Sequence, residues 1–276
     1  MGGNVMDERR GIISTLKYYL KIYFKIVKLY IKTRLQYRED YTIGFIGMIL
    51  RGVLNLVTLY ILFNNIETLG GYTFDHMVFL CGLYMFAITP AESLLVNIWY
   101  LHMHINQGTL IKYCLRPIDS MFYYFSEIIE FKSFTQILIA LPLIFIYGFK
   151  IGIVWSFFNI FLLAFAMLMS SIIVAELYIC IASISFWALD SSPLLDLLQQ
   201  IIDISRYPIN IYNKIMTIFL CFLIPIGCIA YIPMLLLVNG NSIIFITILI
   251  FITILFGVIC RIVWNNGIKR YTGTGS

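Results

Sequence analysis

The sequence predicts an all-α integral membrane protein, with six transmembrane helices that follow an N-terminal amphipathic helix lying in the membrane interface. Hydrophobic residues make up 61% of the 276 residues and charged residues only 12%, whereas soluble domains are about 45–50% apolar and about 25% charged. Apolar stretches of membrane-spanning length recur along the chain, and the basic residues are concentrated in a few places. One soluble core cannot bury this much apolar surface, so the surplus must face lipid.

Residues 1–40 are expected to form a cytoplasmic segment that contains the interfacial helix. Five lysines recur there at three- and four-residue steps, which places them on one face of a helix. These lysines are Lys17, Lys21, Lys25, Lys28 and Lys32. Such a helix lies on a membrane, where its lysines can meet anionic headgroups. The alternative is an amphipathic helix that packs on a soluble core.

A transmembrane domain is expected over residues 41–264, followed by a cytoplasmic tail at 265–276. Its apolar segments are 42–64, 76–100, 121–147, 151–188, 213–238 and 241–264. Each is long enough for a membrane-spanning helix, which needs about 20 residues. The fifth segment contains Pro225, Gly227 and Pro233. Because proline removes a backbone donor, we expect a kink or a re-entrant turn there, near the outer face.

The distribution of basic residues predicts which side of the membrane each connection occupies. With the N-terminus inside, sixteen of the nineteen Lys and Arg residues fall on the cytoplasmic side, and Lys150 alone falls on the outer side. The cytoplasmic side then includes the connections 102–120 and 189–214. The positive-inside rule therefore predicts a multi-pass protein of the bacterial inner membrane, with both termini in the cytoplasm.

The sequence lacks the motifs of several functional classes. It has no GxxxxGK[ST] phosphate loop, so the chain is not expected to bind ATP by itself. Its six cysteines include no CxxC pair, and we expect neither a metal site nor a cofactor in this chain. The basic residues lie beside membrane spans, which favours contact with lipid over contact with nucleic acid. We do not expect the chain to be an enzyme.

Charged residues in or near the apolar segments are candidates for a functional role. A charge at the bilayer centre costs at least about 2.5–3.5 kcal/mol, so each such residue should face a partner helix or a water-filled cavity. The candidates are Arg51, Glu92, Glu127, Glu130, Lys132 and Glu176. Glu127 and Glu130 are three residues apart and would share a helix face. They could line a path for a substrate, or they could pair with Arg51 or Lys132 and lock helices together.

Three stretches resemble the permeases of ABC type 2 exporters, in particular the viologen-exporter family. The first is GTLIKYCLRPIDSMFY at 108–123, which is similar to the family's Gly-x-x-x-x-Tyr-x-Leu-Arg-Pro signature. The second is SRYPINIY at 205–212, which is followed by IPIGCIAYIP at 224–233. The third is the ending WNNGIKRYTGTGS at 264–276, which resembles the family's Trp-x-x-Gly-x-x-x-Tyr tail. The matches occur in the family's order and cover nearly the whole membrane region.

The resemblance implies a transport function that is shared among several subunits. It implies six spans, an N-terminal interfacial helix and a dimer of permease subunits, which can be identical or related. It also implies two separate cytoplasmic nucleotide-binding subunits, which bind ATP and Mg²⁺ and drive export. The substrate does not follow from the resemblance.

The connection at 102–118 is expected to contain the coupling helix that docks in a groove of the ATPase. The residues expected to make this contact are Leu110, Ile111, Lys112, Tyr113, Leu115, Arg116 and Pro117. The apolar side chains would fill the groove, and the basic ones would reach acidic or carbonyl groups at its rim. Pro117 would determine how the third span leaves the loop. The alternative is an ordinary loop, held inside by its positive charges.

Two other classes of membrane protein remain open at this point. The chain could be a non-transporting scaffold or an ion channel. A channel should show a polar stripe or a ring of charges along its pore, whereas the polar residues within these spans are few and scattered.

Overall fold

The computed structural model describes residues 12–34, 38–238 and 242–271. The other residues fall outside this part, and they include the start of the expected N-terminal segment, the expected outer turn at 239–241 and the end of the tail. The described part is built of helices, together with one isolated β-bridge between Leu69 and Tyr72.

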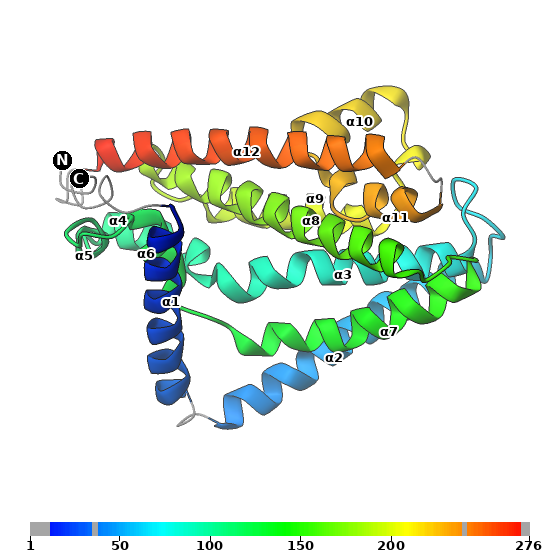
Figure 1. Ribbon diagram of the computed structural model, residues 1–276, viewed down its shortest axis with the longest axis horizontal. Helices are drawn as coiled ribbons and strands as arrows, with labels where there is room; N and C mark the ends of the chain where they lie inside the picture. The colour runs from blue at the N-terminus through cyan, green and yellow to red at the C-terminus, as the bar shows by residue number, and fades with distance from the viewer. Residues whose placement is uncertain (1–11, 35–37, 239–241, 272–276) are drawn as a thin grey trace.

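The longer helices lie along one common direction, with one exception (Figure 1). They are α1 (Ile12–Arg34), α2 (Arg38–Phe63), α3 (Phe74–Leu94), α7 (Thr135–Lys150), α8 (Phe157–Ser183), α9 (Ser192–Asp203) and α12 (Ser242–Arg270). Within the described residues, five helices are long and apolar enough to cross a membrane. These cover 42–63, 74–94, 131–150, 157–186 and 243–270.

Short helices and helical turns connect the long ones. At one end of the bundle these are η1 (Val96–Tyr100), α4 (Leu101–Asn106), α5 (Ile111–Cys114), α6 (Ser120–Ser126), η2 (Phe131–Phe134) and η3 (Ile184–Phe186). Between α9 and α12 lie η4 (Ile204–Arg206), η5 (Ile209–Ile211), α10 (Lys214–Ile218), the π-turn η6 (Phe219–Leu223), η7 (Ile226–Cys228) and α11 (Tyr231–Val238).

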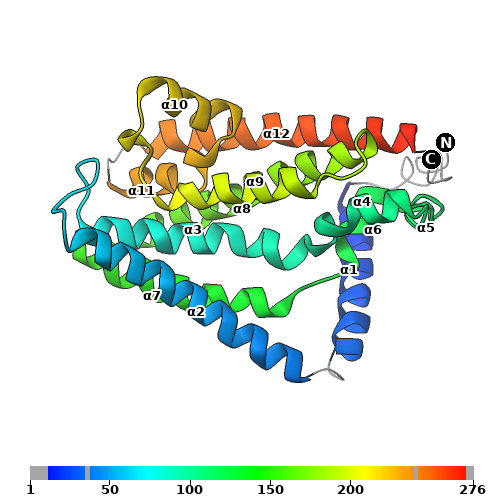
Figure 2. The same ribbon diagram turned by 180° about the vertical axis from the view of Figure 1, so that it is seen from behind.

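The core of the bundle surrounds α3. This helix packs between α7 and α8, and α12 packs on α8 (Figures 1 and 2). Phe79 and Leu80 of α3 are fully buried. Gly82 lets α7 approach closely, because a Cβ at this position would lie 3.0 Å from Ile144 Cγ1. Close approach at small residues is the usual way in which membrane helices associate.

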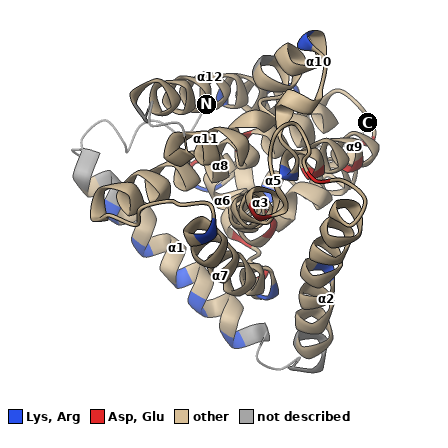
Figure 3. Cartoon of the chain, turned by 90° about the vertical axis from the view of Figure 1, so that its right-hand side faces the viewer, with Lys and Arg blue, Asp and Glu red and all other residues tan. Residues whose placement is uncertain are grey.

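The exception in direction is α1, which runs across the end of the bundle rather than along it (Figures 1 and 2). Tyr19 joins it to α6 through an edge-to-face contact with Phe122, whose ring centroid lies 4.8 Å away. The five lysines named above are exposed along one side of the helix, and this side forms a basic row (Figure 3). The helix and its lysine face therefore agree with the sequence pattern.

The fifth apolar segment differs from its prediction. We expected a span over 213–238, but the chain there forms α10, a π-turn, the short η7 and α11. Pro225 interrupts the backbone, as the sequence predicted, and Gly227 lies so close to Ile209 that a Cβ would overlap it. The expected break is therefore present, and it divides the segment into pieces that are too short to cross, so no single helix spans 213–238.

The connection 189–214 also differs from its prediction. It begins beside α4, where Asn106 Nδ2 donates to the Leu189 carbonyl oxygen at 2.8 Å. It ends at the opposite end of the bundle, where Asn210 Nδ2 donates to the carbonyl oxygen of Gly70, between α2 and α3, at 2.7 Å. The segment thus runs the length of the bundle, and it is not a loop that returns to the α4 end. Arg206 and Lys214 consequently do not belong with the basic residues of that end.

Two expected boundaries shift as well. The third apolar segment is not one helix, because α6 ends at Ser126 and residues 127–130 are not helical before η2 and α7 follow. The tail was expected to begin at 265, but α12 continues to Arg270.

Candidate functional site

A cluster of charged and polar side chains joins four segments inside the bundle. Arg51 of α2 lies between two carboxylates, with Nη1 3.1 Å from Glu92 Oε1 of α3 and Nη2 3.9 Å from Asp203 Oδ1 of α9. Gln136 of α7 donates to the other oxygen of Glu92 at 2.6 Å. The Tyr84 hydroxyl of α3 donates a hydrogen bond to Asp203. Each charge has an opposite charge beside it, which lowers the cost of placing it within the membrane.

The polar face continues along α2 and the segment after α9. Arg206 Nη1 donates to Asn55 Oδ1 of α2 at 2.6 Å. The Arg51 side chain remains 42% exposed, whereas Glu92 is only 14% exposed. A half-exposed arginine in a membrane span should face a partner or a water-filled cavity rather than lipid. The arrangement can therefore hold a polar or charged molecule at this face, or a second polypeptide.

Of the sequence-based candidates, Glu92 pairs with Arg51, whereas Glu127 and Glu130 do not. Arg51 pairs with neither Glu127 nor Glu130, because both follow the end of α6 and lie in the non-helical segment. The expectation that these two glutamates share a helix face is therefore wrong. Glu130 pairs with Lys132, one of the two partners considered from the sequence, whose Nζ lies 3.3 Å from Glu130 Oε2.

Glu176 of α8 lies apart from the Arg51 cluster, against α12. A Cβ on Gly257 of α12 would lie 2.8 Å from Glu176 Oε1. The other carboxylate oxygen of Glu176 is buried and has no hydrogen-bond partner among the described residues. Glu176 therefore belongs to the packing between α8 and α12, and it does not extend the polar face of α2.

Sequence reasoning missed Asp203, Gln136 and Tyr84. Asp203 was assigned to a loop, although Leu195, Leu198 and Ile202 recur at helical spacing and are the residues that α9 buries. That periodicity could have identified a helix here. No sequence signal marked Gln136 or Tyr84, because a single polar residue in a span does not reveal its partner.

The connection 101–119 forms a compact end piece beyond α3. It contains α4, a turn at Gly108 with φ of 71°, and α5. Leu110 and Tyr113 are each only 1% exposed, so they pack inside the protein and cannot fill a groove in a partner. This part of the sequence expectation is wrong. The other five predicted contact residues are exposed, and they are called the exposed face of the end piece below: Ile111, Lys112, Leu115, Arg116 and Pro117.

An aromatic cluster packs against the inner side of the end piece, behind its exposed face. Tyr113 packs edge-to-face on Tyr124 of α6 with ring centroids 4.8 Å apart, and His104 packs on the same Tyr124 at 5.8 Å. The Tyr124 hydroxyl donates to the Asn97 carbonyl oxygen at 2.8 Å, and Asn97 Nδ2 donates back to the Tyr124 carbonyl oxygen at 2.6 Å. Buried aromatic pairs and these hydrogen bonds restrict motion, so the end piece is firmly attached to α6.

Charges also attach the end piece to its neighbours. Glu127 pairs with Lys112 at 3.3 Å, and it accepts a hydrogen bond from the Tyr113 hydroxyl. Asp119 caps α6 by accepting from the Phe122 N–H at 2.9 Å, and it also pairs with Arg261 of α12. Burial alone would raise the pKa of Asp119, but the hydrogen bonds from Arg261 and the Phe122 N–H lower it below its usual value.

The end of α12 explains part of the C-terminal motif. Trp264 is fully buried and packs on Phe125 and Phe186, with ring centroids 5.3 and 5.5 Å away. Gly267 provides space for Phe186, because a Cβ at this position would overlap the ring. Trp264 and Gly267 thus connect α12 to both α6 and η3. The motif's residues 272–276 lie outside the described part.

Comparison with known proteins identifies the family. A family model described as an ABC-2 family transporter protein matches residues 49–275, from the middle of α2 to the end of the described part and beyond. No curated protein and no solved structure matches the chain. The match covers most of the sequence, including four of the five helices of membrane length and most of the first one, the polar cluster and the end piece. The chain therefore belongs to the ABC-2 transporter family, and it is a membrane permease component of an ABC transporter.

Proposed function

We propose that this protein is the permease subunit of an ATP-driven exporter. It forms the substrate path with a second permease subunit, identical or related, as in the viologen-exporter family. Two copies of a separate ABC ATPase subunit drive it, and ATP and Mg²⁺ bind in those subunits. The family match supports the role as a permease, and the exposed face of the end piece supports the coupling to an ATPase.

The observation that carries this proposal is the composition of that face. Leu115 is 76% exposed and Ile111 is 43% exposed, at the end of the bundle rather than on its lipid-facing sides. Lys112 and Arg116 flank them. An apolar group with a basic rim suits a groove in a soluble partner. The contact between Tyr113 and Tyr124 attaches this face to α6. A force applied to the face is therefore transmitted to α6 and α12 and is not lost in a flexible loop.

The remaining basic residues support one orientation of the protein in the membrane. The end with α1 and the end piece also carries Lys269 and Arg270 in the last turn of α12. The opposite end carries Lys150 at the end of α7, and Lys214 follows the segment that reaches Gly70. By the positive-inside rule the α1 end lies in the cytoplasm of a bacterial cell, and so do both termini. The segment from α9 to η5 then serves as the fifth of six crossings.

The path for the substrate lies along the polar face of α2 and α9. In the most apolar 18-residue stretch of α2 only 11% of the residues are buried, compared with 78% in the corresponding stretch of α3. A second permease subunit against α2 would cover Arg51 and the Arg206–Asn55 pair, which lipid cannot solvate. The exported molecule would pass between the two subunits.

The basic face of α1 holds the permease to anionic lipid. Each lysine near an anionic membrane surface contributes about 1 kcal/mol. The transverse direction of α1 and its exposed lysines support this role (Figure 3).

The coupling is tested by changing Leu115 to Asp. Because Leu115 is exposed, the variant should insert and fold normally, whereas a charge in the buried contact should weaken binding of the ATPase. The measurement is the amount of ATP-hydrolysing subunit that co-purifies with the permease, together with ATPase activity in liposomes. Leu189→Asp is the matched control, because Leu189 is 83% exposed at the same end of the bundle but outside the face.

We expect Leu115→Asp to lose the ATPase and Leu189→Asp to retain it. If Leu115→Asp retains the ATPase and its activity at the wild-type level, the end piece is not the coupling element.

A further inference from the structure

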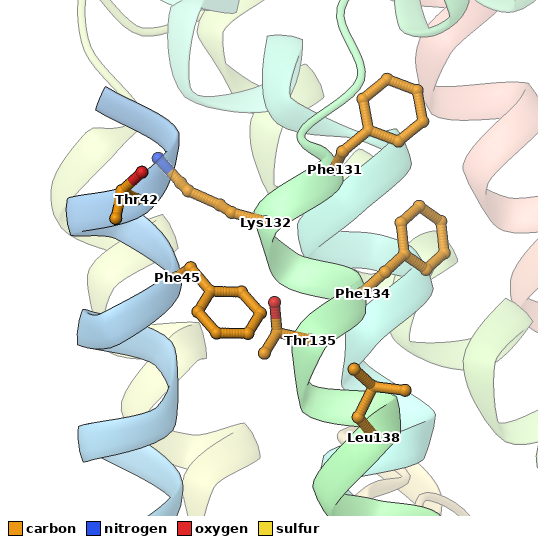
Figure 4. Close-up of a pocket in the computed structure, with 7 residues that line it drawn as sticks. All are labelled: Thr42, Phe45, Phe131, Lys132, Phe134, Thr135 and Leu138. Carbon is orange, nitrogen blue, oxygen red and sulfur yellow. The ribbon is translucent and has the colours of Figure 1, made fainter. Parts of the chain in front are cut away.

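A groove opens on the outer surface of the bundle between α2 and the start of the η2–α7 segment. Its volume is ≈ 540 Å³. Its lining residues are Thr42, Phe45, Phe131, Lys132, Phe134, Thr135 and Leu138. Aromatic rings and one leucine form most of this lining, and the polar groups gather toward one end (Figure 4). The groove thus has one polar and one apolar end.

Lys132 lies at the polar end, where it bridges two helices. Its side chain extends from η2 across to α2 (Figure 4). Gly44 makes this crossing possible, because a Cβ there would lie 2.6 Å from Lys132 Cδ. The ammonium group pairs with Glu130 at 3.3 Å, and the side chain is 36% exposed. An ammonium group has three donors, so Lys132 can bind a second anion while it keeps Glu130.

The position of the groove along the bundle matches the boundary between headgroups and hydrocarbon. Thr42 and Phe131 are the first residues of two helices long and apolar enough to cross a membrane. From Phe131 the groove follows the helix to Leu138, which corresponds to a depth of about 10 Å at 1.5 Å per residue. The lysine-bearing helix α1 lies at the same end of the bundle (Figures 1 and 2).

We propose that this groove binds one anionic phospholipid from the leaflet on the α1 side. The phosphate group lies beside Lys132 at the polar end, and one acyl chain fills the apolar end between Phe45 and Leu138. Basic pockets between membrane helices bind anionic headgroups in this way. The lipid would fill the space between α2 and α7 and fix their spacing. The inference does not depend on what the protein transports.

The test measures which lipids stay with the purified full-length chain. The protein is reconstituted with equal amounts of phosphatidylglycerol and phosphatidylcholine and then extracted in mild detergent. Native mass spectrometry identifies the lipids that remain bound to it. We expect preferential retention of phosphatidylglycerol. Lys132→Gln should reduce this retention by about fivefold, the factor that one lysine near an anionic surface contributes. Lys132→Arg should retain the lipid, because it keeps the charge.

Two further variants separate the groove from general electrostatic attraction. Leu138→Trp fills the apolar end without changing a charge, and it should also reduce retention of phosphatidylglycerol. Lys150→Gln removes an exposed lysine at the opposite end of the bundle, and it should retain lipid like the wild type. The size-exclusion profile of each variant verifies that it is folded and reports its oligomeric state.

Three results would overturn the proposal. The first is equal retention of the two lipids by the wild type, which would mean that the groove holds only bulk lipid. The second is unchanged retention in Leu138→Trp together with an unchanged oligomeric state, which would assign the lipid to the lysines of α1. The third is a changed oligomeric state in Leu138→Trp without loss of lipid, which would show that a second permease subunit occupies the groove.

Discussion

The neighbouring helices α2 and α3 are of similar length but lie in very different surroundings. The mean hydropathy of the membrane-length part is 1.9 for α2 and 1.5 for α3, yet the two are 11% and 78% buried. The less apolar helix is thus the more deeply buried one. In a soluble protein the opposite order is usual. In a membrane, lipid solvates apolar side chains as well as a protein core does, so hydropathy alone does not determine which helix lies inside.

Small and polar residues distinguish the two helices instead. The buried residues of α3 include Gly82, Ala87, Thr89, Ala91 and Ser93. These residues let α7 and α8 approach closely, and Thr89 satisfies its hydroxyl by donating to the Met85 carbonyl oxygen at 2.7 Å. The strongest polar attachment of α2 is the ion pair from Arg51 to Glu92. We therefore regard α3 as the centre of the bundle and α2 as a peripheral helix with an exposed outer face.

The largest expected effect is on α3. It is seen when a glycine on α3 and a glycine on α2 are each replaced by leucine. Gly82→Leu should strongly destabilise the protein, by about 1–3 kcal/mol or more, because a Cβ would already lie 3.1 Å from Leu143 Cβ and 3.2 Å from the Ala140 carbonyl oxygen. Gly47→Leu on α2 should have little effect, since no atom of the described residues lies within 4 Å of its Cβ position. Thermal unfolding of the two variants in detergent measures the difference. Equal losses would mean that α2 is as closely packed as α3.

A smaller effect is expected from separating α2 from α3 at their ion pair. Arg51→Met leaves Glu92 without its cation, and we expect a loss of about 1–2 kcal/mol, below the about 3–5 kcal/mol of a fully buried pair because Arg51 is half exposed. The double variant Arg51→Met with Glu92→Gln should recover part of this loss. A double-mutant cycle on thermal stability measures the coupling. Strictly additive losses would show that the pair does not attach α2.

The smallest expected effect concerns His104, in the end piece that follows α3. Burial, and then the charge of Lys112, lower the pKa of His104 below its usual 6.5, and Glu127 opposes part of this shift. The folded state therefore binds a proton less readily than the unfolded state does. The stability that the neutral imidazole contributes is complete above pH 6.5, and it declines as the pH falls below that value toward the folded pKa. His104→Gln should flatten this part of the profile of melting temperature against pH. An unchanged slope would assign the titration to another group.

Some properties of this protein follow from its sequence alone. The surplus of apolar residues requires a membrane, and the 20-residue scale of the bilayer sets the length of its helices. The lysine period predicted a helix that has an exposed basic side, which α1 has. Pro225 predicted the break before α11, because a residue without an N–H cannot donate the hydrogen bond of a helix interior, although α3 and α7 continue past Pro90 and Pro142. These are local or compositional properties, and they need no knowledge of neighbouring segments.

Only the tertiary structure decided which residues meet. The end piece is amphipathic in sequence, but its turn at Gly108 and the ring of Tyr124 determine that Tyr113 faces inward while Leu115 faces outward. Arg51 could have paired with any nearby carboxylate, and the path of α9 along the bundle brought Asp203 to it. Helical spacing describes the faces of one helix, whereas contacts between helices depend on how the whole chain folds back on itself. The polar face of α2 could therefore not be predicted from the sequence.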